Sequence, residues 1–127
     1  MAIITTTQIL EQGPRNLVVH WTGVSDGVGN EDGVLKVDVS TLSPPCGSVK
    51  ILRVDGNVEF GMVEIYWDAL TPVKALELSG DIHLDFCKVG GMVNNAGGGK
   101  TGDVLLSTTG FELNSTYDLY IEMIKKQ

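Results

Sequence analysis

Apolar and polar residues alternate with a period of two in several short runs of this chain. In residues 81–86 every second residue is apolar, and residues 35–39, 63–67 and 117–123 follow the same pattern. Successive side chains of a β-strand point to opposite faces of a sheet, so each run has one polar and one apolar face. The pattern therefore predicts an all-β protein.

Glycine and proline separate the alternating runs. The predicted strands cover residues 3–10, 16–24, 34–39, 49–54, 58–67, 73–78, 81–89, 103–108 and 115–124. Asp55, Gly56 and Asn57 are typical of a tight hairpin turn, because glycine accommodates positive φ. Ser79 and Gly80 predict a second hairpin.

The final segment has a helical alternative. Tyr117, Tyr120, Ile121 and Ile124 also match the spacing of one helix face. The period-two match extends through Met123, and β-branched and aromatic residues favour extended structure. We therefore expect a strand in residues 115–124.

These elements predict one domain. Its 127 residues are enough for one hydrophobic core, and no repeat or linker divides them. Eight or nine short antiparallel strands favour a two-sheet sandwich that resembles a jelly roll. We expect residues 1–12 to form an extended N-terminal arm or strand, and residues 13–127 to form a single β-sandwich domain.

The charge balance excludes one class of partner. Sixteen acidic residues outnumber nine basic ones, which gives a formal charge of −7 and a pI of about 4.6. Affinity for nucleic acid comes mainly from lysine and arginine contacts to phosphates, so we expect no nucleic-acid partner. An acidic surface suits a basic protein partner better.

The compartment is inferred from apolar runs and cysteines. No apolar run approaches the roughly 20 residues that span a bilayer, and the first residues lack a secretion signal. We expect a protein that is made and used without crossing a membrane by that route. Cys46 and Cys87 are expected to be unpaired and partly buried, as in a cytosolic protein.

Two glycine-rich loops resemble ligand-binding motifs but lack their key positions. Gly99, Lys100 and Thr101 end like a phosphate-binding loop, but Asn94 replaces its first glycine and a predicted strand follows. We interpret this segment as a surface or contact loop. Residues 26–33 resemble a calcium loop, but alignment puts Val28 and Val39 at ligand positions. A solvated acidic turn is favoured there, with another oxygen-rich ion site as the alternative.

Asp81, His83 and Asp85 share one face of a predicted strand. Such a row suits metal binding or acid–base chemistry, but alternation predicts that this face is simply the solvated one. His20 lies on a different strand and cannot be placed relative to His83. The chain has no nucleophile elbow and no metalloprotease motif, so we assign no catalytic, metal or cofactor residues.

Other residues are assigned to the core or to the surface. Trp21 and Trp67 fall on apolar faces and are expected in the core. Acidic residues on the polar faces are expected on the solvent or partner side: Glu59, Glu64, Glu77, Asp81 and Asp85.

Two segments carry a resemblance to a known group of proteins. Residues 63–73 and 90–108 resemble segments of small virion proteins of tailed bacteriophages. Those proteins also carry the motif at residues 13–16, followed by the Leu-Val-Val at 17–19 and the Thr-Gly pair at 22–23. The resemblance spans roughly residues 10–125.

The resemblance implies a non-enzymatic structural protein of the phage particle. The most direct implication is a capsid decoration or cement protein on the outside of the head. Such a protein is made in the host bacterial cytoplasm and carried in the virion. Such proteins are often β-sandwiches or jelly rolls and frequently trimers. The expected partner is the major capsid protein or another virion protein, and no cofactor or membrane is expected.

Loops and arms are the expected contacts, because sandwiches present irregular segments for binding. The candidate partner contacts are Ile3, Ile4, Thr5, Thr6, Thr7, Ile9, Asn94, Asn95 and Lys100. Three alternatives stay open: a neck, tail or fibre-attachment component of the virion, a carbohydrate-binding module, and an enzyme. A carbohydrate module would need exposed aromatic side chains.

Overall fold

A computed structural model describes residues 3–25, 33–42 and 44–126, and these residues form seven β-strands and two short 3₁₀ helices. The elements are β1 (Ile3–Gln12), β2 (Asn16–Ser25), β3 (Val34–Val37), η1 (Val39–Thr41), β4 (Ser48–Trp67), β5 (Val73–Asp85), η2 (Cys87–Val89), β6 (Val104–Thr109) and β7 (Thr116–Lys126). The prediction of an all-β fold is confirmed, and the last segment is a strand.

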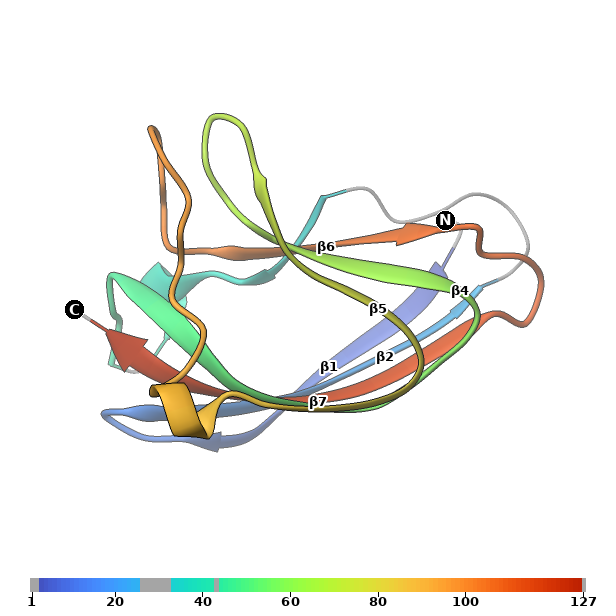
Figure 1. Ribbon diagram of the computed structural model, residues 1–127, viewed down its shortest axis with the longest axis horizontal. Coiled ribbons are helices and arrows are strands. Elements are labelled where there is room, and N and C mark those ends of the chain that lie inside the picture. Colours follow the sequence, from blue (N-terminus) through green and yellow to red (C-terminus); the bar gives the residue numbers. More distant parts are fainter. Residues whose placement is uncertain (1–2, 26–32, 43, 127) are drawn as a thin grey trace.

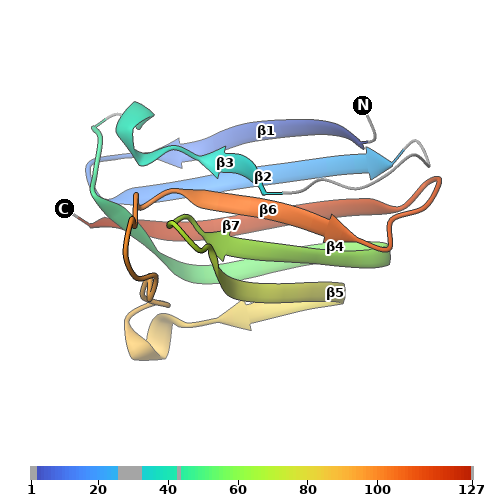
Figure 2. The ribbon, with the colours of Figure 1, turned by 90° about the horizontal axis from the view of Figure 1, so that it is seen from above.

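All strand pairs are antiparallel and belong to one curled sheet. The order is β1-β2-β7-β4-β6-β3, and β5 pairs with β4. Figure 1 shows β6 in an upper layer and β1, β2 and β7 in a lower one. Seen from above, β3 and β6 lie across the lower layer (Figure 2).

The long strand β4 joins the two layers. Its residues 48–59 pair with β7, whereas residues 62–67 pair with β6. The β4–β5 register shifts between Val58 and Val63, where the hairpin bends from one layer to the other. Phe60 lies in this bend with a φ of 59°, and Ser115 Oγ donates to its carbonyl oxygen at 2.7 Å. The bend lets one hairpin belong to both layers.

Both predicted hairpin turns are wrong. Residues 55–57 lie inside β4 and residues 79–80 inside β5, which reduces the predicted eight or nine strands to seven in the described chain. Gly56 has a φ of 149°, and a Cβ there would lie 2.0 Å from the carbonyl oxygen of Asp118. Glycine serves here for close approach of β7 rather than for a turn. Gly80, with a φ of 67°, opposes Val58 next to the bend.

The core fills the space between the layers. Every second residue of β2 and β7 is buried, as the alternation predicts. Trp21 and Trp67 are fully buried, which confirms their assignment to the core. Tyr117 is the third large side chain there. The apolar faces of β2 and β7 are therefore covered by packing.

Candidate functional site

The row predicted on β5 lies on the outer face of the lower layer. Asp81, His83 and Asp85 are all exposed, as expected. Each meets a residue of β4: Asn57 Nδ2 donates to Asp81 at 2.5 Å, His83 Nδ1 lies 3.2 Å from Asp55 Oδ1, and Arg53 Nη2 donates to Asp85 at 3.1 Å. The three side chains pair across strands instead of converging on one point.

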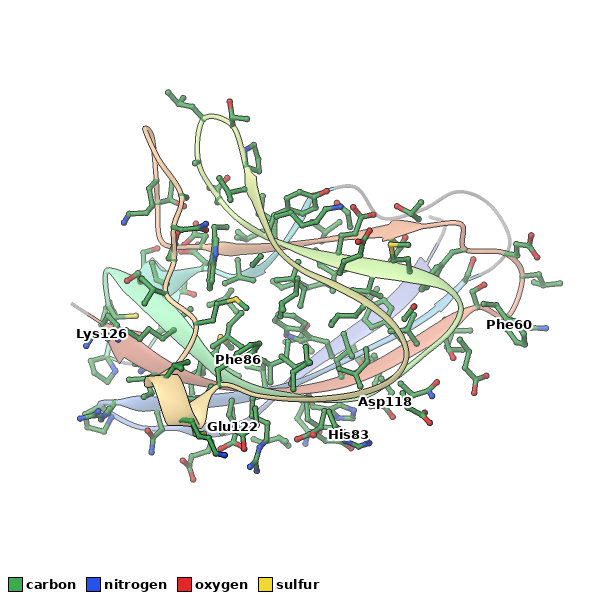
Figure 3. All side chains as sticks on the ribbon, viewed as in Figure 1. Phe60, His83, Phe86, Asp118, Glu122 and Lys126 are labelled. Atoms are coloured by element: carbon green, nitrogen blue, oxygen red, sulfur yellow. The ribbon has the colours of Figure 1, made fainter. Side chains whose placement is uncertain are left out.

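The same face also carries His20. Its ring stacks on Tyr120 with centroids 4.1 Å apart, and its Nε2 lies 2.5 Å from Asp118 Oδ1. The register places His83, Asp55, Tyr120 and His20 in one row across four strands. Strand spacing separates the two histidines by about 14 Å. Figure 3 shows His83 and Asp118 along this face.

This face is an acidic, hydrogen-bonded surface. Arg53 faces Asp85, Glu122 and Asp55 at 3.1, 3.6 and 4.0 Å. Hydrogen bonds from the backbone N–H and the thiol of Cys87, and then from the Arg53 guanidinium, lower the pKa of Asp85 to about 2. Within the described ranges, no group of three or more histidine, cysteine or acidic residues could hold a metal ion.

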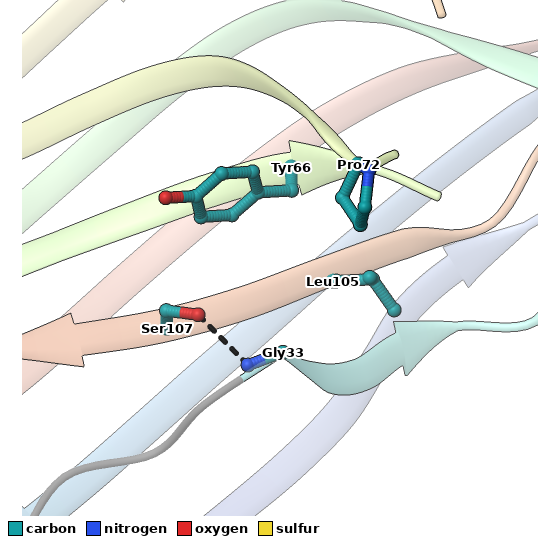
Figure 4. Close-up of a pocket in the computed structure, with 5 residues that line it drawn as sticks. All are labelled: Gly33, Tyr66, Pro72, Leu105 and Ser107. Carbon is teal, nitrogen blue, oxygen red and sulfur yellow. Dashed lines mark hydrogen bonds between the residues drawn. The ribbon is translucent and has the colours of Figure 1, made fainter. Parts of the chain in front are cut away.

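A hollow of about 260 Å³ lies on the outer face of the upper layer (Figure 4). Tyr66, Pro72 and Leu105 give it apolar walls, and Gly33 and Ser107 close another side. Ser107 Oγ accepts a hydrogen bond from the Gly33 N–H at 2.8 Å. The hollow offers an aromatic ring and apolar atoms to a small ligand.

Glu64 anchors the polar groups near this hollow. It was expected on the solvent side, but its side chain is buried beneath its neighbours, so that expectation is wrong. Tyr66 donates to it at 2.9 Å, Thr109 Oγ1 also donates, and Lys74 Nζ lies 3.1 Å away. The Thr109 and Tyr66 hydrogen bonds lower the pKa of Glu64. Glu59 and Glu77 are exposed, which confirms the prediction for these two residues.

Two loops project side by side from the upper layer, and we call residues 68–72 and 97–103 the paired loops (Figure 1). Leu70 N–H donates to Gly98 at 3.2 Å, and Thr101 Oγ1 donates to Asp68 Oδ2 at 2.8 Å. Asp68 N–H donates to the Asp103 carbonyl at 3.0 Å. The side chain of Leu70 is 86% exposed. The paired loops thus hold an apolar side chain out in solvent.

The chain enters the second loop through an ordered segment. Met92 forms two backbone hydrogen bonds with Ile51, at 2.7 and 3.1 Å. Asn94 is only 8% exposed, and its Oδ1 accepts from the Ala96 N–H at 2.9 Å. Asn95 and Lys100 are exposed. Of these three predicted contacts, only Asn95 and Lys100 present their side chains to solvent.

The other predicted contacts lie on β1, away from the paired loops. Thr6, Thr7 and Ile9 are exposed and Thr5 is half-buried. Ile3 and Ile4 pair with Ser25 and Val24 of β2. The sequence-predicted contacts therefore fall on two separate segments, β1 and residues 94–100, which lead into the second of the paired loops.

Sequence reasoning missed Asp68 and Leu70 as members of a surface. The only signal was the resemblance of residues 63–73, which did not show that this segment meets residues 97–103. A strand, β6, follows Lys100 and Thr101, as predicted, so this loop does not lead into a helix. Residues 26–33, where we expect a solvated acidic turn, lie mostly outside the described residues. Cys46 is half-buried and Cys87 exposed, and both are free thiols.

The comparisons give no family for this chain. None of the helices among the described residues has the length and hydropathy of a membrane span. No protein-family model matches the chain, and neither a curated protein nor a solved structure matches it.

Proposed function

We propose that this chain is a non-enzymatic structural protein of a bacteriophage particle, and that it acts as a capsid decoration or cement protein. One observation carries the proposal: the two segments with the virion-protein resemblance contact each other. Asp68 and Leu70 of the first segment hydrogen-bond to Gly98, Thr101 and Asp103 of the second. Segments that resemble one group of proteins together form one projecting surface.

The proposed mechanism is mass action. A protein that binds the assembled shell but not its free subunits stabilises the shell by its binding free energy. Leu70 supplies an exposed apolar anchor on the paired loops, and Lys100 supplies a nearby charge. Apolar anchors that enter a partner's pocket carry much of the energy of a protein interface.

The proposed partner is the major capsid protein or another virion protein. We propose a homo-oligomer that is located in the virion after synthesis in the bacterial cytoplasm. We also propose that the curled sheet is a variant of the jelly-roll-like sandwich, with the β4–β5 hairpin shared by both layers. A neck, tail or fibre-attachment component uses the same surface with a different partner.

The stoichiometry of purified particles tests this proposal. Particles encoded by the same genome are purified by density, and the chain is quantified by mass spectrometry against the shell subunit. A copy number comparable to that of the shell subunit supports decoration. A small fraction of that number assigns the chain to the neck or tail instead, and its absence from particles refutes the virion role.

Matched leucine variants test the surface itself. Leu70→Ser alters the paired loops, whereas Leu113→Ser alters an exposed leucine in the loop at the other end of β6. Particles that lack the chain are mixed with each purified variant, and the bound amount is measured after sedimentation. Loss of binding for Leu70→Ser alone supports the proposal. Equal binding by both variants removes the paired loops from the interface.

A second candidate function rests on the hollow over Tyr66. An aromatic ring beside Pro72 and Leu105 suits stacking of a sugar ring, which a carbohydrate-binding module needs. Binding to a glycan array, compared between the wild type and Tyr66→Ala, tests this function. Glycan binding that Tyr66→Ala abolishes favours the carbohydrate module over the virion role.

A further inference from the structure

Three strands of the curled sheet have one unpaired edge among the described residues. β1 pairs only with β2, β3 only with β6, and β5 only with β4. Alternate residues along such an edge direct their N–H and C=O groups away from the sheet. An open edge is therefore a template for another strand unless side chains or bends protect it.

Two of the three edges carry such protection. β3 has only four residues, and its register with β6 is interrupted. β5 carries the exposed charged residues Lys74, Glu77, Asp81 and Asp85, and Gly80 lies beside the bend. Short length, charge and bending each oppose pairing with another chain.

β1 has none of these protections over most of its length. It is ten residues long, and residues 3–10 contain no charged residue and no proline. Its register with β2 runs without interruption from Ile3 to Ile9, and the shift comes only between Ile9 and Glu11. Ile9 and Leu10 are 51% and 47% exposed. A regular, neutral and partly apolar ladder is therefore open on one side.

We propose that the open edge of β1 pairs antiparallel with β1 of a second copy, forming a two-fold symmetric dimer with one sheet continuous through both protomers. An antiparallel pair of identical strands is self-complementary, so one edge satisfies both partners. The lack of charge on this edge favours a second copy of the same acidic chain as the partner. Of sixteen acidic residues in the chain, Glu11 alone lies on β1, outside the regular ladder.

The acidic residues of β7 lie far enough away to permit this contact. Asp118 and Glu122 are on β7, which is separated from β1 by β2. In the dimer, the two copies of β7 are five strand spacings apart, or about 24 Å, which exceeds the screening length of about 8 Å at physiological salt. Threonine pairs suit the new ladder, as the bond between the Thr6 and Thr22 hydroxyls shows within the chain.

Concentration-dependent mass measurement tests the dimer. The wild type, Thr7→Lys and the matched control Thr71→Lys are compared by sedimentation at low and high micromolar concentrations. Thr7 is exposed on β1, and Thr71 is exposed on the paired loops. A dimer is expected for the wild type and Thr71→Lys, and a monomer for Thr7→Lys, because each copy then brings a positive charge to the otherwise neutral edge. Equal circular dichroism spectra show that all three variants fold.

Hydrogen exchange locates the interface. Among residues 3–10, the amides that point away from β2 are expected to exchange at least tenfold more slowly in the dimer than in Thr7→Lys at the same concentration. A monomer at every concentration, a trimer, or a dimer that Thr7→Lys leaves intact overturns the inference. So does a dimer whose β1 amides stay unprotected. The inference does not depend on the virion role, and each can fail without the other.

Discussion

At the scale of single residues, the Glu64 carboxylate is a shared partner for three polar side chains. Tyr66, Thr109 and Lys74 all contact its carboxylate. Glu64→Ala removes the shared acceptor, while its partly exposed partners can still bond to water, so we expect a loss of about 0.5–1.5 kcal/mol of unfolding free energy. Urea denaturation of the variant measures this loss.

Glu77 provides the matched control. It lies opposite Glu64 on β5 and is exposed, with Lys74 Nζ 3.5 Å away. Glu77→Ala should change stability by less than about 0.5 kcal/mol, as surface substitutions usually do. Equal losses in the two variants would show that Glu64 does not act as an anchor.

Gly56 is a position inside β4 where an added methyl group should be strongly destabilising. A Cβ would lie 2.0 Å from the Asp118 carbonyl oxygen, and the φ of 149° is open mainly to glycine. Gly56→Ala should cost about 3 kcal/mol or more, because overpacking and backbone strain add. Gly97→Ala, with nothing within 4 Å, is the control. Thermal unfolding that is equal for both variants contradicts the close approach of β7 to β4.

At the scale of elements, β1 and β7 differ in what they support. β7 lies between β2 and β4 and buries Tyr117, Leu119, Ile121 and Met123. β1 is an edge whose side chains at residues 6–11 are all exposed. Deletion of residues 2–10 should therefore leave a folded core, whereas deletion of residues 116–127 should abolish folding.

Far-ultraviolet circular dichroism and dispersion of amide proton signals measure both outcomes. A folded deletion of residues 2–10 that no longer associates also supports a contact role for β1. An unfolded chain after that deletion, or a folded one without β7, contradicts the assignment of edge and centre.

One side-chain hydrogen bond joins the paired loops in addition to their backbone hydrogen bonds. Asp68→Ala removes the acceptor for Thr101 Oγ1, which is worth about 0.5–1.5 kcal/mol of local stability. Hydrogen exchange of residues 97–103 should accelerate by up to about tenfold, while β6 stays protected. Thr71→Ala in the same loop is the control. Unchanged exchange in Asp68→Ala would show that the loops are held together in another way.

The alternation predicted elements better than it predicted their connections. When one face of a strand is buried, every second residue along the strand is apolar. Trp21, Trp67 and the buried side of β7 could therefore be identified from the pattern. The turn at Gly56 was wrong because local turn chemistry competes with pairing to β7, a segment more than fifty residues away in sequence. The same limit applies to Asp68 and Thr101, since no local pattern encodes a hydrogen bond between distant loops.

At the scale of the whole molecule, acidity governs how the protein behaves in solution. The chain carries a formal charge of −7 at neutral pH and has a pI of about 4.6. Mutual repulsion keeps charged copies apart, and it vanishes near the pI. A contact between copies is then most favourable where charge is absent, which in this fold is the edge of β1.

The stability of the whole fold should also fall as the pH is lowered. The folded pKa values of Asp85 and Glu64 lie below their ordinary values of 3.8 and 4.5, that of Asp85 at about 2. A group with a lowered folded pKa contributes stability that is fully present above its unfolded pKa. This contribution is lost as pH falls through the folded value. The melting temperature should thus stay nearly constant down to about 4.5 and decline towards about 2.

The two carboxylates can be separated by substitution. Asp85→Asn removes the ionisable group but keeps a side-chain oxygen that accepts from the Cys87 N–H. This variant should melt below the wild type at neutral pH, and the difference should shrink as pH approaches 2 because the wild-type carboxylate then becomes protonated as well. Glu64→Gln should behave in the same way over its own lowered range. A difference that grows on acidification would mean that these carboxylates destabilise the folded chain, and the acidic face would then be a strained surface rather than a paired one.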